Sequence, residues 1–200
     1  MWRTVVLSTA LAVSLTSCSG SDPEPGADPD ATPTEAVDVV PTDPGTDLDF
    51  GEPATLVWQP AQDLTGVLDL TVDSVAEQRQ SVFDGWTRDE AMATARPYFV
   101  QVSLTNTGES DLAGQAVPLY LRDDTGALGA PWTFGGDFTA CQSGPLPTPF
   151  PTGTETEMCL VYLAPDGARV RDLVFEPTDG YDPITWSGEV TRPGKKRGRG

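Results

Sequence analysis

The sequence contains no histidine and only two lysines. Without histidine, Ser-His-Asp and Cys-His catalysis, most zinc sites and any imidazole switch near neutral pH are excluded. Lys195 and Lys196 both lie in the last six residues, so a Schiff-base or Ser-Lys mechanism has no candidate within a folded body. Acidic residues are plentiful, but no pattern pairs two of them as in a glycosidase. We therefore expect no catalytic residue, no cofactor and no enzymatic activity.

Positive charge is scarce as well. The chain has 12 basic and 30 acidic residues, a net charge of −18. Residues 55–192 alone hold seven arginines against 20 acidic residues, which leaves them at −13. Binding to DNA or RNA through counterion release needs clustered Lys and Arg. We expect no nucleic-acid partner.

The sequence has one apolar run at its N-terminus, and it is short. Residues 4–15 span about 12 residues, whereas a membrane-spanning helix needs roughly 20. Met1-Trp2-Arg3 supplies a positive segment before the run, and Leu15-Thr16-Ser17-Cys18 ends it in the manner of a lipoprotein cleavage box. An ordinary secretory signal is the alternative, although leucine suits its outer recognition position poorly.

Lipidation of Cys18 would determine where the protein works. We expect residues 1–17 to be a lipoprotein signal peptide that is removed, and Cys18 to carry the acyl chains. Two or more acyl chains anchor a protein stably, at about 0.8 kcal/mol per buried methylene. The predicted location is the extracytoplasmic face of the cell membrane, with the lipid on Cys18 as the membrane contact.

Cysteine is rare, and its count fits an exported protein. Of the three cysteines, Cys141 and Cys159 remain if Cys18 carries lipid. In an oxidising compartment these two are free to form a disulfide, with two buried free thiols as the alternative.

Both ends of the chain lack the composition of a folded core. Residues 18–54 are rich in Pro, Asp, Glu, Thr and Gly, with ten carboxylates and no basic residue after Cys18. This composition predicts a disordered acidic linker, with a docking segment as the alternative. Residues 193–200 reverse the charge and predict a disordered basic tail that could touch anionic headgroups or wall polymers.

Between these ends, residues 55–192 read as short strands separated by turns. Apolar and polar residues alternate along several runs, a pattern typical of half-buried strands. The predicted strands are residues 55–58, 68–72, 98–104, 117–121, 158–163, 173–175 and 184–186. Thr87-Arg88-Asp89-Glu90 has a capping-box pattern and predicts one short helix over residues 89–95. The fold class is all-β: a single antiparallel β-sandwich.

Several segments together resemble a known group of domains. They are residues 97–108, ending in Asn106-Thr107-Gly108, then Cys141, the stretch 159–165 and Ile184-Thr185-Trp186. The chain is similar here to the immunoglobulin-like domains of actinobacterial envelope lipoproteins, and more distantly to mycobacterial secreted immunogenic antigens. The resemblance implies an immunoglobulin-like sandwich and an envelope location, and it supplies no catalytic residues. Cys141 and Cys159 are too close in sequence to join the two sheets as antibody cysteines do.

Four tryptophans are candidates for core or contact residues. Trp58, Trp132 and Trp186 lie in or beside strand-like runs, where a large ring usually fills a core. Trp86 differs, because Phe83-Asp84-Gly85-Trp86 lies between predicted strands in a polar setting. We therefore place a candidate binding loop at Phe83 and Trp86, with core packing as the alternative.

Acidic clusters invite a calcium interpretation, which their spacing does not support. Residues 47–52 carry three carboxylates, and Asp123-Asp124 lie at a predicted turn. Neither matches a twelve-residue calcium loop, and a hard cation needs six to eight oxygens. We expect no metal site.

Taken together, these features predict a lipid-anchored protein that binds an envelope protein or a wall component without catalysis. Three alternatives stay open: a solute-binding lipoprotein that serves a transporter, a carboxylate hydrolase of wall glycans, and a structural spacer. A deep pocket with a few convergent polar groups would favour the first, and two carboxylates facing each other across a groove the second. A flat exposed patch around Trp86 would favour partner binding, and the absence of all three features would favour the spacer.

Overall fold

Side chains alternate between a buried and an exposed face along each long strand, as in β3 (Leu64–Glu77), where Leu68, Leu70 and Val72 are fully buried. The computed structural model describes residues 39–194. Cys18, the predicted signal peptide and the basic residues from Lys195 onward lie outside these residues. The strands are β1 (Asp47–Asp49), β2 (Pro53–Ala61), β3 (Leu64–Glu77), β4 (Arg96–Asn106), β5 (Tyr120–Asp123), β6 (Leu128–Gly129), β7 (Glu155–Ala164), β8 (Val170–Phe175), β9 (Ile184–Ser187) and β10 (Val190–Thr191). The helical elements are η1 (Gln80–Phe83), α1 (Glu90–Thr94) and η2 (Pro165–Gly167).

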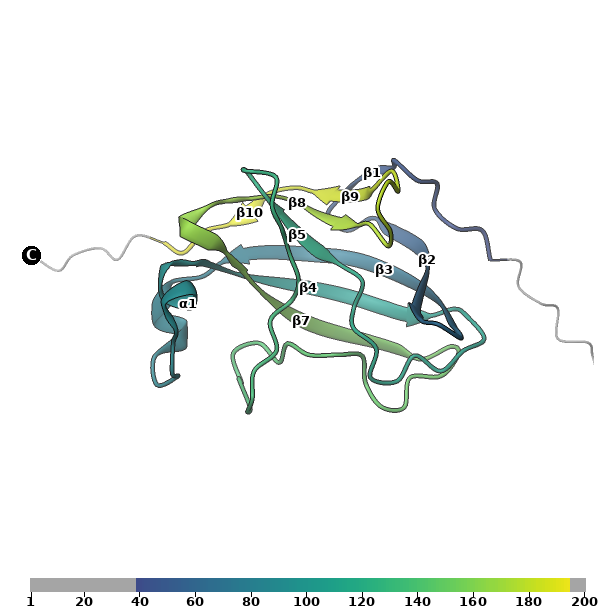
Figure 1. Ribbon diagram of the computed structural model, residues 1–200, viewed down its shortest axis with the longest axis horizontal. Coiled ribbons are helices and arrows are strands. Elements are labelled where there is room, and N and C mark those ends of the chain that lie inside the picture. Colours follow the sequence, from purple (N-terminus) through teal and green to yellow (C-terminus); the bar gives the residue numbers. More distant parts are fainter. Residues whose placement is uncertain (1–38, 195–200) are drawn as a thin grey trace, which may run out of the picture. The chain divides into compact units, whose positions relative to one another are not determined.

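The strands form two sheets that face each other (Figure 1). Sheet A has the order β1-β9-β8-β5-β6, and sheet B has the order β10-β3-β4-β7 with β2 also paired to β3. Most pairs are antiparallel, while β1 with β9 and β10 with β3 are parallel. The all-β sandwich predicted from the sequence is confirmed.

The strand order is that of an immunoglobulin-like domain. In such domains one sheet contains strands A, B and E and the other strands C, F and G. Here β3, β4 and β7 correspond to the first set, and β5, β8 and β9 to the second. The chain passes from sheet B to sheet A between β4 and β5, returns to sheet B between β6 and β7, and crosses to sheet A again between β7 and β8, as in a Greek key. Within residues 39–194 no strand takes the place of D; an irregular segment follows β6 instead.

The main core lies between the sheets. Trp186 is fully buried there and Trp58 almost so, which confirms core packing for both tryptophans. Tyr162 of β7 is buried in the core, and its hydroxyl donates a 2.8 Å hydrogen bond to the carbonyl of Leu119, just before β5. Burial raises the pKa of Tyr162 well above 10.0, so the hydroxyl keeps its proton and this bond.

Each of the seven predicted strands overlaps a strand of the structure, although β5 begins at Tyr120 and the prediction began at Val117. The N-terminal boundary of the domain lies earlier than predicted. Residues 39–54 were expected to belong to the linker, whereas β1 pairs with β9 and the Gly45 N–H donates to the Asp182 carbonyl. Leu48 and Phe50 pack against the main core and hold this segment in the domain. The prediction missed them because it rested on the average composition, in which Pro and Asp are prominent. The domain includes at least residues 42–191.

The predicted helix is present and shorter. α1 begins at Glu90, and the Asp89 carboxylate accepts a 2.7 Å hydrogen bond from the Met92 N–H. Asp89 is therefore the N-cap, in place of Thr87. None of the helices within residues 39–194 has the length and apolar character needed to cross a bilayer.

Candidate functional site

A second, smaller apolar cluster covers the outer face of sheet B. Phe99 of β4 lies opposite Val161 of β7, and both point away from the main core because their neighbours Val100 and Leu160 point into it. Two segments cover this pair of strands: the connection that holds η1 and α1, and residues 130–145, which we call the aromatic loop. We call this packing the outer cluster. Its buried members are Phe83, Met92, Phe138, Cys141 and Val161.

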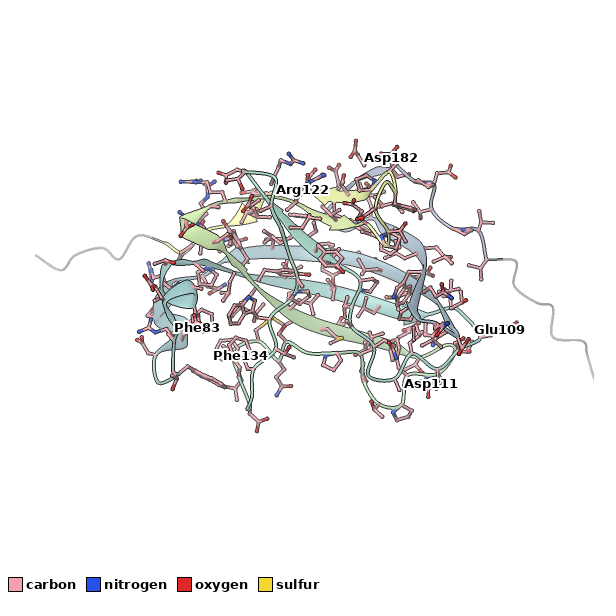
Figure 2. All side chains as sticks on the ribbon, in the orientation of Figure 1. Phe83, Glu109, Asp111, Arg122, Phe134 and Asp182 are labelled. Carbon is pink, nitrogen blue, oxygen red and sulfur yellow. A yellow bond between two sulfur atoms is a disulfide. The ribbon has the colours of Figure 1, made fainter. Side chains whose placement is uncertain are left out.

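The candidate binding residues Phe83 and Trp86 both belong to the outer cluster. Phe83 is fully buried and lies near Phe134 (Figure 2). Its ring centroid is 6.0 Å from that of Phe134 and 5.5 Å from that of Phe138. Trp86 is half-buried and meets the same two rings edge-on, at 5.3 and 5.6 Å. Phe83 therefore has no surface to offer a partner, whereas Trp86 packs with one part of its ring and exposes another. Binding through Trp86 stays a prediction.

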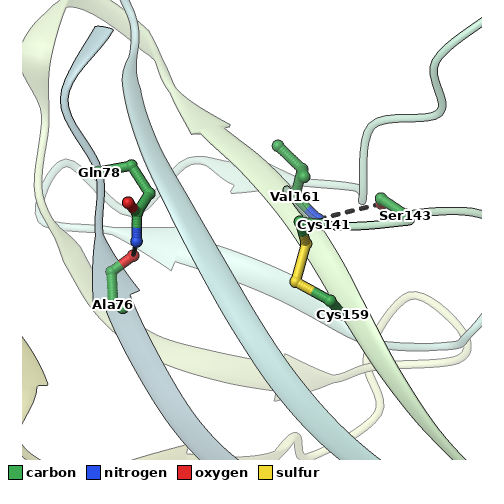
Figure 3. Close-up of a disulfide and its surroundings, with 6 residues drawn as sticks. All are labelled: Ala76, Gln78, Cys141, Ser143, Cys159 and Val161. Carbon is green, nitrogen blue, oxygen red and sulfur yellow. Dashed lines mark hydrogen bonds between the residues drawn. A yellow bond between two sulfur atoms is a disulfide. The ribbon is translucent and has the colours of Figure 1, made fainter. Parts of the chain in front are cut away.

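The disulfide ties the aromatic loop to sheet B. Cys141 of the loop is bonded to Cys159 of β7, with Cα atoms 5.2 Å apart, which confirms the predicted pair (Figure 3). Two further contacts fix the loop along the outer edge of β7. The Trp132 N–H donates to the Val161 carbonyl at 2.7 Å, and the Val161 N–H donates to Ser143 Oγ at 3.0 Å. The bridge joins a loop to one sheet, so it is not the inter-sheet bridge of antibody domains.

A half-open groove lies beside the anchored aromatic loop. Its volume is about 390 Å³, within the usual range for ligand sites. Three segments form its walls: the chain entering β5, the start of the aromatic loop and the end of that loop. The lining residues are Gly114, Ala116, Val117, Tyr120, Ala130, Pro131, Trp132, Thr133, Gly144 and Pro145.

The chemistry of the groove suits binding. None of its lining residues is charged, and Tyr120 and Thr133 supply its side-chain hydroxyls. Trp132 and Tyr120 supply aromatic rings, both half-buried, between two prolines and several small residues. Because no carboxylate lines this groove, it holds no pair of groups for acid-base hydrolysis of a glycan.

Sequence reasoning placed Trp132 in the core and missed the groove. In the structure Trp132 packs against the outer cluster and also lines the groove, so it belongs to both. A signal was present: residues 130–154 form a long segment without regular strands, rich in Pro, Gly and aromatic residues. Long irregular loops on a rigid scaffold commonly carry function.

The acidic segments serve the fold. In β1, Asp47 accepts a hydrogen bond from the Thr185 hydroxyl, and Glu52 accepts one from the Asp49 N–H at 2.7 Å. Asp123 accepts three hydrogen bonds from its own turn, and Asp124 accepts one from the Arg169 N–H. Within residues 39–194 no group of three or more acidic or cysteine side chains is placed to hold a metal ion.

We compared the chain with protein-family models, with curated proteins and with solved structures, and none of the three comparisons found a match.

Proposed function

We propose that this protein is a lipid-anchored lipoprotein of the extracytoplasmic membrane face, whose immunoglobulin-like domain binds an envelope protein or a wall component without catalysis. The observation that carries the binding role is the uncharged groove lined by Trp132 and Tyr120. Aromatic anchors of this kind dominate the binding energy of many interfaces. The anchor rests on the Leu15-to-Cys18 motif of the sequence.

The arrangement of the groove supports a binding site that is ready before the partner arrives. The disulfide and the two hydrogen bonds to Val161 hold the aromatic loop against β7. A wall fixed in this way loses little conformational entropy when a ligand binds. The groove is half-open to solvent, which suits an extended partner better than an enclosed small solute, and this favours an adaptor over a transporter-linked solute carrier.

The anchor is tested by metabolic labelling with an alkyne fatty acid. We expect label on the wild-type protein in the membrane fraction and none on a Cys18→Ser variant, which lacks the acceptor thiol. A mature wild-type protein recovered without acyl chains from living cells would overturn the anchor.

Binding is tested by site-specific crosslinking in the native envelope. A photo-crosslinking residue at Thr133, which lines the groove, is compared with one at the exposed Ala93 of α1. We expect one defined protein or wall fragment to be captured from position 133 and not from position 93. Adding Ala130→Lys, which fills the groove with a charged side chain, should abolish this capture. Equal capture from both positions, or capture that survives Ala130→Lys, would contradict binding at the groove.

Trp86 is tested in the same assay. If the exposed part of its ring also contacts the partner, Trp86→Ala weakens capture from position 133 while the domain stays folded. Unchanged capture by the folded variant would leave Trp86 with its packing role alone.

A further inference from the structure

The groove is so apolar that it restricts the chemical class of ligand that can bind there. Among its lining side chains, hydrogen bonds can come only from the Tyr120 hydroxyl, the Thr133 hydroxyl and the Trp132 indole N–H. Within residues 39–194 none of these three groups makes a hydrogen bond to another protein group. They are therefore free to bind a ligand, but they are few.

This shortage of polar side chains argues against a sugar. A glycan presents several hydroxyls on every ring, and each hydroxyl buried without a partner costs about 1–3 kcal/mol. A proline-rich peptide has the opposite demand. Its rings are apolar and its prolines have no N–H to satisfy. In the polyproline II conformation many of its carbonyls stay in water, so the groove needs to supply only a small number of donors. Grooves lined by aromatic residues bind such segments in the polyproline II conformation, which is already extended before binding.

The charge of the domain indicates which kind of proline-rich segment can bind. Residues 55–192 have a net charge of −13, so they attract a basic segment and repel an acidic one. The proline-rich segment that precedes the domain, residues 19–38, carries six carboxylates and no basic residue. Repulsion of like charges disfavours it as the occupant. The basic tail of the chain, residues 193–200, has the right charge but only one proline. The favoured occupant is therefore a segment of another protein in which Lys or Arg accompany several prolines.

We propose that the groove between Tyr120, Trp132 and Pro145 binds a basic, proline-rich segment of another envelope protein in the polyproline II conformation. The proposal rests on the binding role given above and names the class of its partner. Proline rings pack against Trp132 and Tyr120, and the three free donors bind peptide carbonyls. Lys or Arg side chains beside the groove meet the acidic field of the domain.

The test uses the full-length mature protein in detergent and a fluorescein-labelled peptide of four Pro-Pro-Lys repeats, followed by fluorescence anisotropy. We expect saturable binding that weakens at least tenfold in Ala130→Lys. The control Ala93→Lys adds the same charge at an exposed site on α1 and should change the affinity less than twofold. Tyr120→Phe, which removes only a hydroxyl, should weaken binding about threefold. Circular dichroism confirms that each variant is folded.

Four further probes test the conformation, the charge and the chemical class of the ligand one at a time. Replacing proline by glycine keeps the charge and removes the preformed conformation, and replacing lysine by glutamate keeps the conformation and reverses the charge. Each change should weaken binding at least tenfold. An N-acetylglucosamine tetramer and a peptide of residues 19–38 should not compete.

Several results would overturn the proposal: no binding of the Pro-Pro-Lys peptide, equal binding of the glycine peptide, equal binding by Ala130→Lys, or competition by the sugar or by the chain's own linker. If crosslinking from position 133 still captures a defined partner that Ala130→Lys removes, binding at the groove stands and only the peptide class is wrong. If neither experiment depends on Ala130, the binding role itself is wrong.

Discussion

At the scale of single residues, Asn106 does more than end a strand. Its side chain is fully buried, and its amide donates 2.8 Å hydrogen bonds to the carbonyls of Ser110 and Phe150. Its side-chain oxygen accepts from the Gly108 N–H at 3.1 Å. One amide thus joins the turn after β4 to the segment that leads back into β7. The sequence predicted a turn at Asn106-Thr107-Gly108 but gave no sign of this second segment.

We expect Asn106→Ala to lower the free energy of unfolding by about 3 kcal/mol. The change removes three hydrogen bonds, each worth about 1 kcal/mol, and leaves the Ser110 carbonyl without its donor. The Phe150 carbonyl still accepts from the Leu112 N–H, and the Gly108 N–H still donates to the Val67 carbonyl. Urea denaturation measures the loss. Gln101→Ala, at an exposed position of the same strand, is the matched control and should change stability by less than about 0.5 kcal/mol. A loss of similar size in both variants would contradict a special role for Asn106.

Asp123 is a buried carboxylate at the end of β5. It is only 1% exposed, and one of its oxygens accepts from the Thr125 hydroxyl, the Thr125 N–H and the Ala127 N–H at 2.6–3.0 Å. These hydrogen bonds, the Thr125 hydroxyl foremost, lower the pKa of Asp123 despite its burial. The charged form is therefore the one that stabilises the fold.

The lowered pKa of Asp123 determines how its contribution to stability changes with pH. Asp123 contributes its stability above about pH 4, the pKa of an aspartate in an unfolded chain, and this contribution is lost as the pH falls through the lowered pKa of the folded state. We expect Asp123→Asn to lower stability at pH 7 by about 1–2 kcal/mol and to reduce the fall of stability below pH 4. Urea denaturation from pH 7 to pH 2 measures both effects, with the exposed Asp63→Asn as control. An unchanged acid slope in Asp123→Asn would show that other carboxylates cause it.

At the scale of elements, the sequence predicted what depends on local pattern. Alternation along residues 68–72 and 98–104 identifies β3 and β4, because one face of each strand packs in the main core. The other face is polar there except at Phe99, which packs in the outer cluster. β1 has three residues, and β6 and β10 have two each, so these strands are too short to show an alternating pattern. Their pairing is set by the partner strand. The groove was not predictable for a related reason: its walls come from three segments that only the folded chain brings together.

The aromatic loop is the element whose position depends most on a covalent bond. Within residues 130–145 the Trp132 N–H, Ser143 and Cys141 hold the loop to β7, and the disulfide is the strongest of these contacts. The sequence predicted this pair from the cysteine count alone. It could not show that the bond also holds one wall of the groove.

We expect the double variant Cys141→Ser, Cys159→Ser to lose about 3 kcal/mol of stability, since the bridge closes a loop with a sequence separation of 18. Amide exchange at Val161 should also accelerate relative to Val102, which lies in the main core away from the loop. Denaturation and hydrogen exchange measure the two effects. Equal acceleration at both valines would indicate global loosening instead of release of the aromatic loop.

At the scale of the whole molecule, composition alone placed the start of the domain too late. Proline and aspartate dominate residues 39–54, as in a disordered linker, yet Phe50 packs on the main core and the Trp186 indole N–H donates to the Glu52 carbonyl at 3.0 Å. The parallel pairing of β1 with β9 completes sheet A. A few apolar residues at the right positions are thus enough to fold a segment whose average composition is polar.

This boundary can be tested by truncation. A chain that starts at residue 39 keeps β1, Phe50 and the partner of Trp186, so we expect it to unfold cooperatively with nearly the stability of the full-length protein. A chain that starts at residue 55 exposes the apolar surface that Phe50 covers, at about 2 kcal/mol, and leaves the buried Trp186 N–H unpaired, at about 1–3 kcal/mol. It should therefore lose on the order of 4 kcal/mol in urea denaturation. Phe50→Ala in the longer chain separates the apolar part of this loss from the hydrogen bond. If both chains unfold at the same urea concentration, residues 39–54 belong to the linker after all.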